Sequence, residues 1–304
     1  MQSQIVKLTN STRRYLRPKL AKYPHLHNLS ISIHRKYCST TGFLHLLPDF
    51  YLIGFAKCGT SSLYEYLIQH PSISPAATKE IHFFDRHFGR GINWYKNNFP
   101  FKFQRNLLTL NKKNFLTGEA TPRYIEHPFA PNRIKSFTPN AKFIILVRNP
   151  VDRAYSHWNM NVRGKVEPLS FEDALNEEEN RTKNEYKKMI DDPDYYSRSY
   201  YRYSYLERGM YVKKIKNWMK IFPKENFIVI KSEDFFSNPS SSYNQILDFF
   251  ELHSWELSEY KQHRVGKYKK SKMDYETRKR LLEFYQPYND ELSDLLKADF
   301  SWNK

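Results

Sequence analysis

The chain has 304 residues, which is long enough to bury a large core as one domain with or without appendages. Its 23 tyrosines and 22 phenylalanines exclude low-complexity disorder for most of the sequence. Only two cysteines are present, Cys38 and Cys58, which excludes a disulfide framework and a Cys/His metal site. The low cysteine count also favours a reducing compartment.

The formal net charge of +17 is unevenly distributed along the chain. Residues 1–48 contain eight Lys or Arg and no Asp or Glu. Such a surface suits polyanions, including nucleotides, acidic glycans, nucleic acid and anionic membranes, although a simply solvated arm explains the N-terminal charge equally well. We therefore predict a basic N-terminal arm over residues 1–48, followed by one domain over residues 49–304.

The sequence contains no run of about 20 apolar residues, the length that a membrane-spanning helix needs. Its first 20 residues also lack the apolar segment of a secretory signal. We therefore expect a protein without a transmembrane segment, in the cytoplasm. The basic, acid-free composition of residues 1–48 is also typical of an organellar transit peptide, which is the alternative.

After the arm, apolar runs alternate with helical periodicity, a pattern typical of an α/β domain with a mostly parallel sheet. We predict a P-loop-like, three-layer α/β/α fold in which the polar segment 165–204 is an insertion or lid. The expected elements, in chain order, are a strand at 50–55, a helix at 61–69, strands at 142–147 and 227–235, a helix at 241–252 and a helix at 274–296 that Pro287 interrupts.

The first strand leads into a glycine-containing loop, GFAKCGTSS, with the spacing of a phosphate-binding loop. Gly54 and Gly59 are separated as in nucleotide triphosphatases, yet Thr60 stands where those enzymes have lysine. The lysine is Lys57, inside the loop, where its ammonium would neutralise a leaving oxygen on an α-phosphate without a metal ion. The alternative is an ordinary strand–turn–helix with a solvated lysine.

Together with this loop, four further stretches resemble the sulfotransferases that use 3′-phosphoadenosine 5′-phosphosulfate. These are KEIHFFD with GINWYKNNFP, GEATPRYI, LVRNPVDRAYSHW and GKYKKSKMDYETRKRLLEFYQPYNDEL, and together they cover the chain from about residue 50 onwards. The similarity is to the carbohydrate branch of the family, which includes the heparan sulfate sulfotransferases and microbial relatives.

The resemblance implies a nucleotide site built from three parts of the chain. The loop would bind the 5′-phosphosulfate, the segment after strand 142–147 would bind the 3′-phosphate, and a basic C-terminal loop would close over the nucleotide. The implied ligands are Lys57, Cys58, Gly59, Thr60, Ser61 and Ser62 for the first part, Arg148 and Ser156 for the second, and Arg264, Gly266, Lys267 and Tyr268 for the third. The alternative for Arg148 is a surface ion pair with Asp152, and Arg153 is interpreted as a residue of that kind.

Sulfuryl transfer requires a base for the acceptor hydroxyl and positive charge at the leaving phosphate oxygen. The resemblance assigns the base to Glu80, with His82 as the second candidate or an orienting group, and Asp85 lies beside them. If this segment is extended, Glu80 and His82 share one face. Lys57 would be the electrophilic catalyst. The alternative is that Glu80 simply pairs with a neighbouring lysine or arginine on the surface.

Two departures from the family bear on the acceptor. Heparan-type enzymes carry a lysine where this chain has Ala120, with only Arg123 nearby, which disfavours heparan sulfate. The glycine motif and histidine base of the phenol- and steroid-sulfating branch are not found. We therefore expect transfer to a hydroxyl or amine, on a glycan or glycolipid, without a metal and without specific nucleic-acid binding.

The alternatives are a P-loop nucleotide kinase or triphosphatase, and a basic polyanion-binding protein without catalysis. A magnesium requirement would distinguish the first alternative from a sulfotransferase. For the second, no recognised nucleic-acid motif is found in the sequence.

Overall fold

The computed structural model describes residues 37–109, 114–263, 273–300 and 302. Its centre is a five-stranded sheet with the strand order β2-β3-β1-β4-β5, in which every neighbouring pair is parallel. The predicted P-loop-like α/β class is therefore confirmed. The strands are Phe50–Gly54 (β1), Ile73–Pro75 (β2), Leu116–Ala120 (β3), Lys142–Val147 (β4) and Phe227–Lys231 (β5).

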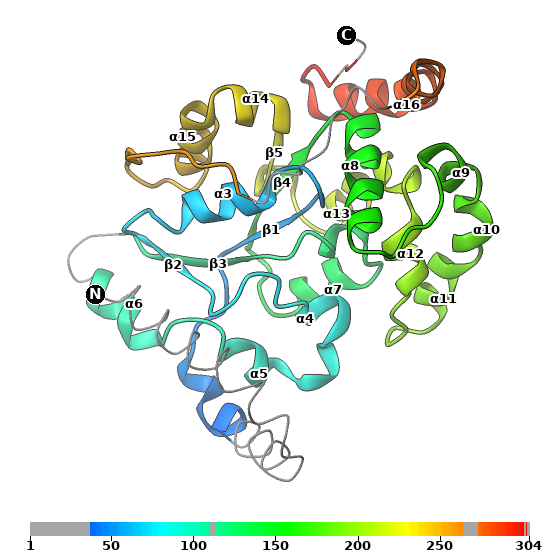
Figure 1. The fold of residues 1–304 in the computed structure, drawn as a ribbon. Coiled ribbons are helices and arrows are strands. Elements are labelled where there is room, and N and C mark those ends of the chain that lie inside the picture. The colour runs from blue at the N-terminus through cyan, green and yellow to red at the C-terminus, as the bar shows by residue number, and fades with distance from the viewer. Residues whose placement is uncertain (1–36, 110–113, 264–272, 301, 303–304) are drawn as a thin grey trace.

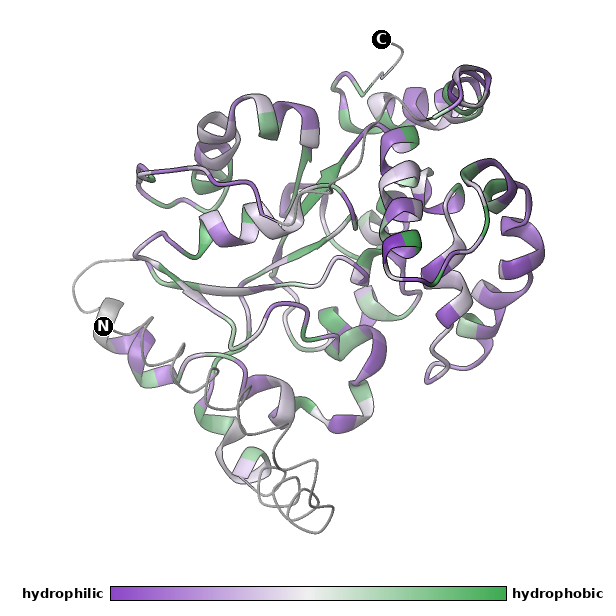
Figure 2. Ribbon diagram, in the orientation of Figure 1, coloured by the Kyte–Doolittle hydropathy of each residue, from purple (hydrophilic) through white to green (hydrophobic). Residues whose placement is uncertain are grey.

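The central strands β1 and β4 form the core of the sheet. Residues 50–53 and 143–147 are fully buried, because a parallel sheet is covered by helices on both faces. This explains why both strands read as continuous apolar runs rather than as alternating patterns. Figure 2 shows the same contrast, with hydrophobic strands inside and mostly hydrophilic outer helices such as α10 and α11.

The helices cover the two faces of the sheet. Figure 1 shows α3, α14 and α15 together on one face, whereas α7 and α13 lie on the other. The α-helices are Thr60–Leu67 (α3), Phe83–Arg86 (α4), Ile92–Lys96 (α5), Lys102–Thr109 (α6), Ala130–Lys135 (α7), Pro150–Arg163 (α8), Phe171–Asn176 (α9), Glu178–Thr182 (α10), Glu185–Asp191 (α11), Arg198–Tyr203 (α12), Tyr211–Met219 (α13), Ser232–Ser237 (α14), Pro239–Phe249 (α15) and Tyr275–Leu296 (α16). The short 3₁₀ helices are Gly42–Leu44 (η1), Phe88–Arg90 (η2), Tyr124–Glu126 (η3), Glu207–Gly209 (η4) and Lys224–Asn226 (η5).

Two predicted elements differ from the structure. The strand predicted over 227–235 ends at Lys231, and α14 follows at once with two acidic residues in its first turn, where the helix dipole favours them. Helix α16 is not interrupted by Pro287. Both Pro287 and Glu283, whose carbonyl loses its usual partner at a proline, are exposed, so water is able to satisfy that carbonyl.

The parallel sheet places the functional segments at one edge. Because β1, β3 and β4 run in the same direction, the loop after Gly54, the segment after Ala120 and the segment after Val147 all begin at their carboxyl ends. The segment predicted as an insertion, 165–204, contains α9 to α12, which Figure 1 shows beside α8. Its role as a lid stays a prediction.

Candidate functional site

The loop between β1 and α3 has a backbone that suits glycine at one position in particular. Gly59 has a φ of 93°, and a Cβ added there would lie 2.8 Å from the Phe236 ring. Lys57 also has a positive φ, of 76°. Thr60 and Ser62 are buried at the start of α3. The free N–H groups of this first turn and the helix dipole make the loop able to hold an anion.

Cations from two other segments lie near Lys57. Burial, followed by the nearby charges of Arg163 and Arg148, lowers the pKa of Lys57 to about 8. The Arg148 guanidinium donates to the Lys57 carbonyl at 3.3 Å, which joins the end of β4 to the loop after β1. These cations repel one another, and a bound anion would reduce that repulsion and favour the protonated form of Lys57.

The predicted 3′-phosphate ligands lie at the end of β4 and along α8. Tyr211 donates to the Arg148 carbonyl at 2.8 Å, and Ser156 is 5 % exposed. The Asp152 carboxylate, the alternative partner proposed for Arg148, accepts a hydrogen bond from Arg278 at 2.9 Å. Arg148 and Ser156 follow the carboxyl end of β4, on the same side of the sheet as the loop after β1, and their role as 3′-phosphate ligands stays a prediction.

Two residues near the loop are buried. Cys58, a predicted ligand, has its side chain in the core, its N–H donating to the Phe55 carbonyl at 3.3 Å and its carbonyl accepting from Ser232 at 2.6 Å. Arg153 was interpreted as a surface residue, and this is wrong: it is 1 % exposed. One of its nitrogens donates to the Tyr205 carbonyl, because α8 turns Arg153 toward the packed interior.

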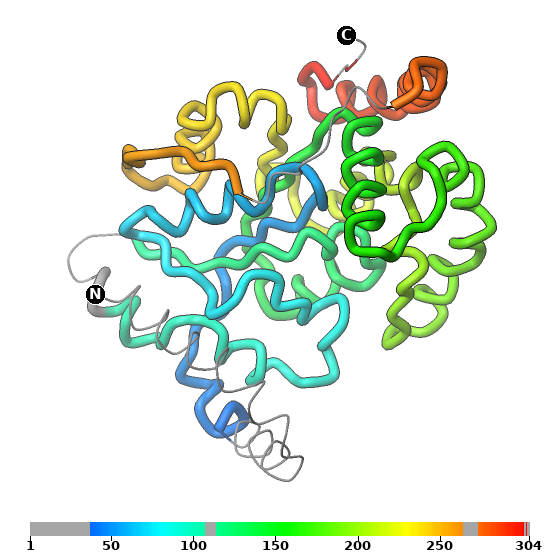
Figure 3. Tube along the Cα trace, in the orientation of Figure 1, coloured from blue at the N-terminus to red at the C-terminus, as the bar shows by residue number. Residues whose placement is uncertain are grey.

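The predicted C-terminal ligands Arg264, Gly266, Lys267 and Tyr268 lie outside the described residues. The segment that leads to them is fixed to α3. The His263 N–H donates to Ser62 Oγ at 2.8 Å, and Tyr66 donates to the Lys261 carbonyl at 3.0 Å. Figure 3 shows this segment, in orange, running along α3. Ser62 therefore holds the chain just before residue 264 beside the loop.

Glu80, His82 and Asp85 form a connected group. The His82 ring lies 2.9 Å from Asp85 through Nδ1 and 3.6 Å from Glu80 through Nε2. The segment is not extended, since Glu80 and His82 have φ values of 61° and 56°. The condition of an extended segment is therefore not met, and left-handed backbone at both positions, rather than strand alternation, brings the two side chains together.

The charges of this group reinforce one another. The hydrogen bond with His82 is the main reason that the pKa of Glu80 lies well below its usual range, although burial opposes the shift. Burial lowers the pKa of His82, but its bonds with Asp85 and Glu80 outweigh burial and raise this pKa above its usual value. At neutral pH, Glu80 is therefore ionised and His82 is protonated.

Lys79 joins this group to the loop. Its ammonium donates to Ser61 Oγ at 2.9 Å and to Glu80 Oε1 at 3.2 Å. The alternative surface pairing of Glu80 is thus present, but Glu80 is only 35 % exposed and contacts His82 as well. Sequence reasoning did not assign Lys79 to the site. The sequence feature that could have indicated Lys79 is its position directly before Glu80, the predicted base.

The fold and the site together define a P-loop-like α/β enzyme whose loop lysine lies before the second glycine. The model of the sulfotransferase domain matches residues 47–288. The chain therefore belongs to the sulfotransferase domain family and is a transferase enzyme, which confirms the family resemblance.

Known relatives carry the same family name. The membrane-associated sulfotransferase kil1 of Dictyostelium discoideum is 28% identical over 86% of this chain and 68% of its own length. Human heparan sulfate glucosamine 3-O-sulfotransferase 3B1 is 28% identical over 84% of this chain, which spans 65% of that protein. A crystal structure of a sulfotransferase from Alicyclobacillus acidocaldarius has a TM-score of 0.62 at 29% identity, covering 84% of this chain and 97% of that one.

The predicted cytoplasmic location is wrong. A relative that matches 86% of this chain is named a membrane-associated sulfotransferase. Among the residues that the structure describes, no helix is both long and apolar enough to cross a bilayer. The prediction rested on cysteine count and hydropathy, and neither quantity reports how a protein is held at a membrane surface.

Proposed function

We propose that the protein transfers a sulfuryl group from 3′-phosphoadenosine 5′-phosphosulfate to a hydroxyl or amine of a glycan or glycolipid. The observation that carries this proposal is the chain of contacts from Ser61 through Lys79 to Glu80 and His82. These contacts support the proposal, because transfer from a donor bound at the loop to an acceptor hydroxyl requires a carboxylate close to that loop.

The residues of the loop fit the donor. The positive φ of Gly59 curves the backbone around a small anion, and Lys57 lies among cations whose repulsion a phosphate group would relieve. Arg148 and Ser156 would hold the 3′-phosphate, with the forked guanidinium matching two phosphate oxygens. When bound, the donor supplies the sulfur that the acceptor oxygen attacks.

The chain's residues then divide the reaction between them. Glu80 takes the proton of the acceptor hydroxyl as a bond forms between the hydroxyl oxygen and sulfur. Lys57 neutralises the phosphate oxygen that leaves as the sulfur–oxygen bond breaks. His82, held by Asp85, positions Glu80 and adds positive charge close to the transferred group.

The direct test is incubation with radiolabelled donor and a panel of glycans, glycolipids and phenols. We expect label in a glycan or glycolipid product, with undiminished transfer in excess EDTA because Lys57 supplies the charge that magnesium provides in phosphoryl transfer. Lys57→Ala should lower turnover by on the order of 100-fold or more. Transfer of label at the wild-type rate by this variant would reject the assignment of Lys57, and a magnesium-dependent phosphoryl transfer would reject the proposed reaction.

A further inference from the structure

A short helix directly follows the proposed base segment, and its first turn is not capped in the usual way. Helix α4 contains only four residues, Phe83–Arg86, and His82 is its N-cap residue. The side chain of an N-cap residue normally accepts a hydrogen bond from a backbone N–H of the first turn. The His82 ring makes no such bond, and its two nitrogens contact Glu80 and Asp85 instead. The first N–H groups of α4 therefore need an acceptor from another part of the chain.

Tyr124, the first residue of η3, supplies that acceptor. Its hydroxyl oxygen accepts a hydrogen bond from the Phe83 N–H at 2.9 Å and a longer one from the Phe84 N–H at 3.5 Å. Tyr124 is fully buried, so its hydroxyl rather than water satisfies these groups. The Tyr124 hydroxyl thus caps α4 in place of the His82 side chain, and the His82 ring is left to contact the two carboxylates.

Glu119 determines which way the Tyr124 hydroxyl points. A tyrosine hydroxyl has a single proton to donate, and Tyr124 donates it to Glu119 Oε1 at 3.1 Å. The lone pairs of the same oxygen are then left for the N–H groups of α4. Glu119 is buried on β3, where Tyr95 donates to Oε1 as well and Thr121 donates to Oε2 at 2.8 Å. Three hydroxyl donors therefore hold the carboxylate that orients Tyr124.

The backbone turn before α4 is held at two points. Glu80 and His82 have left-handed φ values of 61° and 56°. Such backbone persists at residues other than glycine where the surrounding structure fixes it. The Glu80 N–H donates to the Ala120 carbonyl at the end of β3, at 3.0 Å. The Phe83 N–H, directly after His82, donates to Tyr124. The two hydrogen bonds enclose the turn that brings Glu80 and His82 together.

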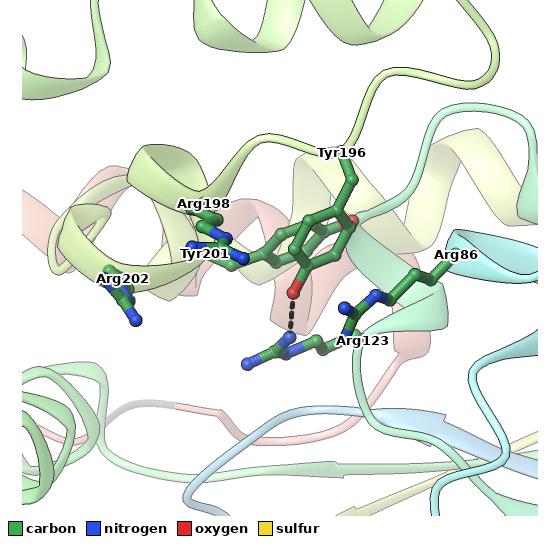
Figure 4. Close-up of a pocket in the computed structure, with 6 residues that line it drawn as sticks. All are labelled: Arg86, Arg123, Tyr196, Arg198, Tyr201 and Arg202. Atoms are coloured by element: carbon green, nitrogen blue, oxygen red, sulfur yellow. Dashed lines mark hydrogen bonds between the residues drawn. The ribbon is translucent and has the colours of Figure 1, made fainter. Parts of the chain in front are cut away.

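The far end of α4 is held by other residues. Arg86 lies over the Tyr196 ring, 5.1 Å from its centroid. Figure 4 shows Arg86 and Arg123 beside Tyr196, and Arg123 donates to the Tyr196 hydroxyl. Loss of the Tyr124 hydroxyl would therefore release the start of α4, next to His82, while the contact at the other end of the helix stays in place.

We propose that Tyr124, oriented by Glu119, is a positioning residue for the proposed base, because its hydroxyl holds the turn that keeps the His82 ring against Glu80. The inference rests on the proposed function, in which Glu80 is the base. The alternative is that Tyr124 and Glu119 contribute to stability alone. In that case, loss of the hydroxyl would lower stability without moving His82.

The pKa of His82 reports whether the turn is intact. Burial lowers this pKa and Arg123 repels the proton, but the bonds with Asp85 and Glu80 outweigh both and raise the pKa to about 9. An imidazole that moved away from the two carboxylates would titrate closer to its ordinary pKa of about 6.5. NMR titration of ¹³C-labelled histidine measures the pKa, and the His82 signal is the one absent from His82→Gln.

The test variant is Tyr124→Phe, which removes the hydroxyl and keeps the ring. We expect the pKa of His82 to fall by about one unit or more as the ring moves away from the carboxylates. Turnover with the labelled donor should fall by on the order of tenfold or more, because a misplaced catalytic group loses rate. Affinity for adenosine 3′,5′-bisphosphate should stay near the wild-type value, which would also show that the variant is folded.

The matched control is Tyr95→Phe. Tyr95 and Tyr124 donate to the same oxygen of Glu119, so each variant takes one donor from the same carboxylate. Of these two hydroxyls, it is that of Tyr124 that accepts from the Phe83 N–H. An effect that acts through the charge of Glu119 would appear in both variants. We therefore expect Tyr95→Phe to change the pKa of His82 and the turnover much less than Tyr124→Phe does.

Equal changes in the pKa of His82 in the two variants would overturn the inference, as would an unchanged pKa in a folded Tyr124→Phe protein. A wild-type pKa of His82 near the ordinary value would overturn it without any variant, since the carboxylates would then not hold the ring. A shifted pKa with unchanged turnover would rule out a positioning role. The pKa is measured without turnover, so the expected shift in a protein that transfers no sulfuryl group would overturn the proposed reaction and leave the support of the His82–Glu80 contact standing.

Discussion

Lys57 carries its charge among other cations, and this determines how it responds to pH. Its pKa is lowered to about 8 by burial and by Arg163 and Arg148. A bound phosphate group would raise this pKa again, because an opposite charge favours the protonated amine. The bound state then holds the proton more tightly than the free state, so binding and protonation are linked.

We predict that affinity for adenosine 3′,5′-bisphosphate is constant below about pH 8 and falls as pH rises above it, since binding then requires proton uptake. Calorimetry between pH 7 and pH 9.5 measures both the affinity and the protons taken up. Lys57→Met should bind more weakly and lose this part of the pH dependence. A wild-type slope retained by Lys57→Met would contradict the link to Lys57.

For Glu80, a substitution can separate a role in catalysis from a role in nucleotide binding. We predict that Glu80→Gln binds the bisphosphate with nearly wild-type affinity but loses turnover by on the order of 100-fold or more, because glutamine is not a base. Calorimetry and the labelled-donor assay measure the two quantities. Glu65→Gln, a substitution on α3 away from the His82 contacts, is the control. Loss of bisphosphate binding together with unchanged turnover would contradict the assignment of Glu80 as the base.

The residue contacts show where sequence reasoning ends. The loop with Lys57 and the segment beginning at Arg148 were recognisable, because their spacing is local and characteristic. The bridge made by Lys79 was not, since it depends on left-handed backbone at Glu80 that no periodicity predicts. Arg153 was misinterpreted because charge alone does not reveal which face of α8 is buried.

At the scale of elements, the loop between β1 and α3 depends on its contact with α14. Gly59 has the left-handed φ of 93°, and Phe236 of α14 fills the space that a side chain would need. The loop is thus shaped by backbone that only glycine adopts readily and by a ring packed against it.

We predict that Gly59→Ala lowers the free energy of unfolding by about 1–3 kcal/mol, through strain and the clash with the ring. Gly89→Ala, where an added Cβ meets nothing within 4 Å, should change it by less than about 0.5 kcal/mol. Urea denaturation measures both values. Equal stability of the two variants would show that the loop accommodates a side chain.

The elements were unequally predictable. The strands β1 and β4 are long apolar runs, and their positions agree with the sequence prediction within a residue. Strands β2 and β3 were missed, because Ile73–Pro75 is only three residues long and Leu116–Ala120 includes Thr, Gly and Glu. Strand β3 pairs with β1, and β2 pairs with β3, so both strands form because of contacts with distant parts of the chain rather than because of their own residues.

At the scale of the whole molecule, Glu119 couples stability to pH. It is fully buried on β3, where it accepts hydrogen bonds from Thr121 at 2.8 Å and Tyr124 at 3.1 Å. Burial raises its pKa to about 7. Because the folded state binds this proton more tightly than the unfolded state, stability from this group is full below the usual pKa of a glutamate and is lost as pH rises toward 7.

We predict that wild-type stability falls by up to about 3 kcal/mol from this group between pH 4.5 and pH 7, and that Glu119→Gln loses this dependence. Thermal or urea unfolding across this range measures the difference between the two proteins. Glu256→Gln, an exposed carboxyl, is the control and should follow the wild type. A slope unchanged in Glu119→Gln would mean that Glu119 is ionised throughout.

The double contact of Lys79 has a kinetic consequence. The Lys79 ammonium donates hydrogen bonds both to the Ser61 hydroxyl, a proposed ligand of the sulfuryl donor, and to the Glu80 carboxylate, the proposed base. A sulfuryl donor bound at the loop would attract the Lys79 ammonium away from Glu80 and so raise the basicity of that carboxylate. Binding of the donor would then favour binding and deprotonation of the acceptor. We therefore expect an ordered addition, donor before acceptor, which initial-rate and product-inhibition kinetics measure.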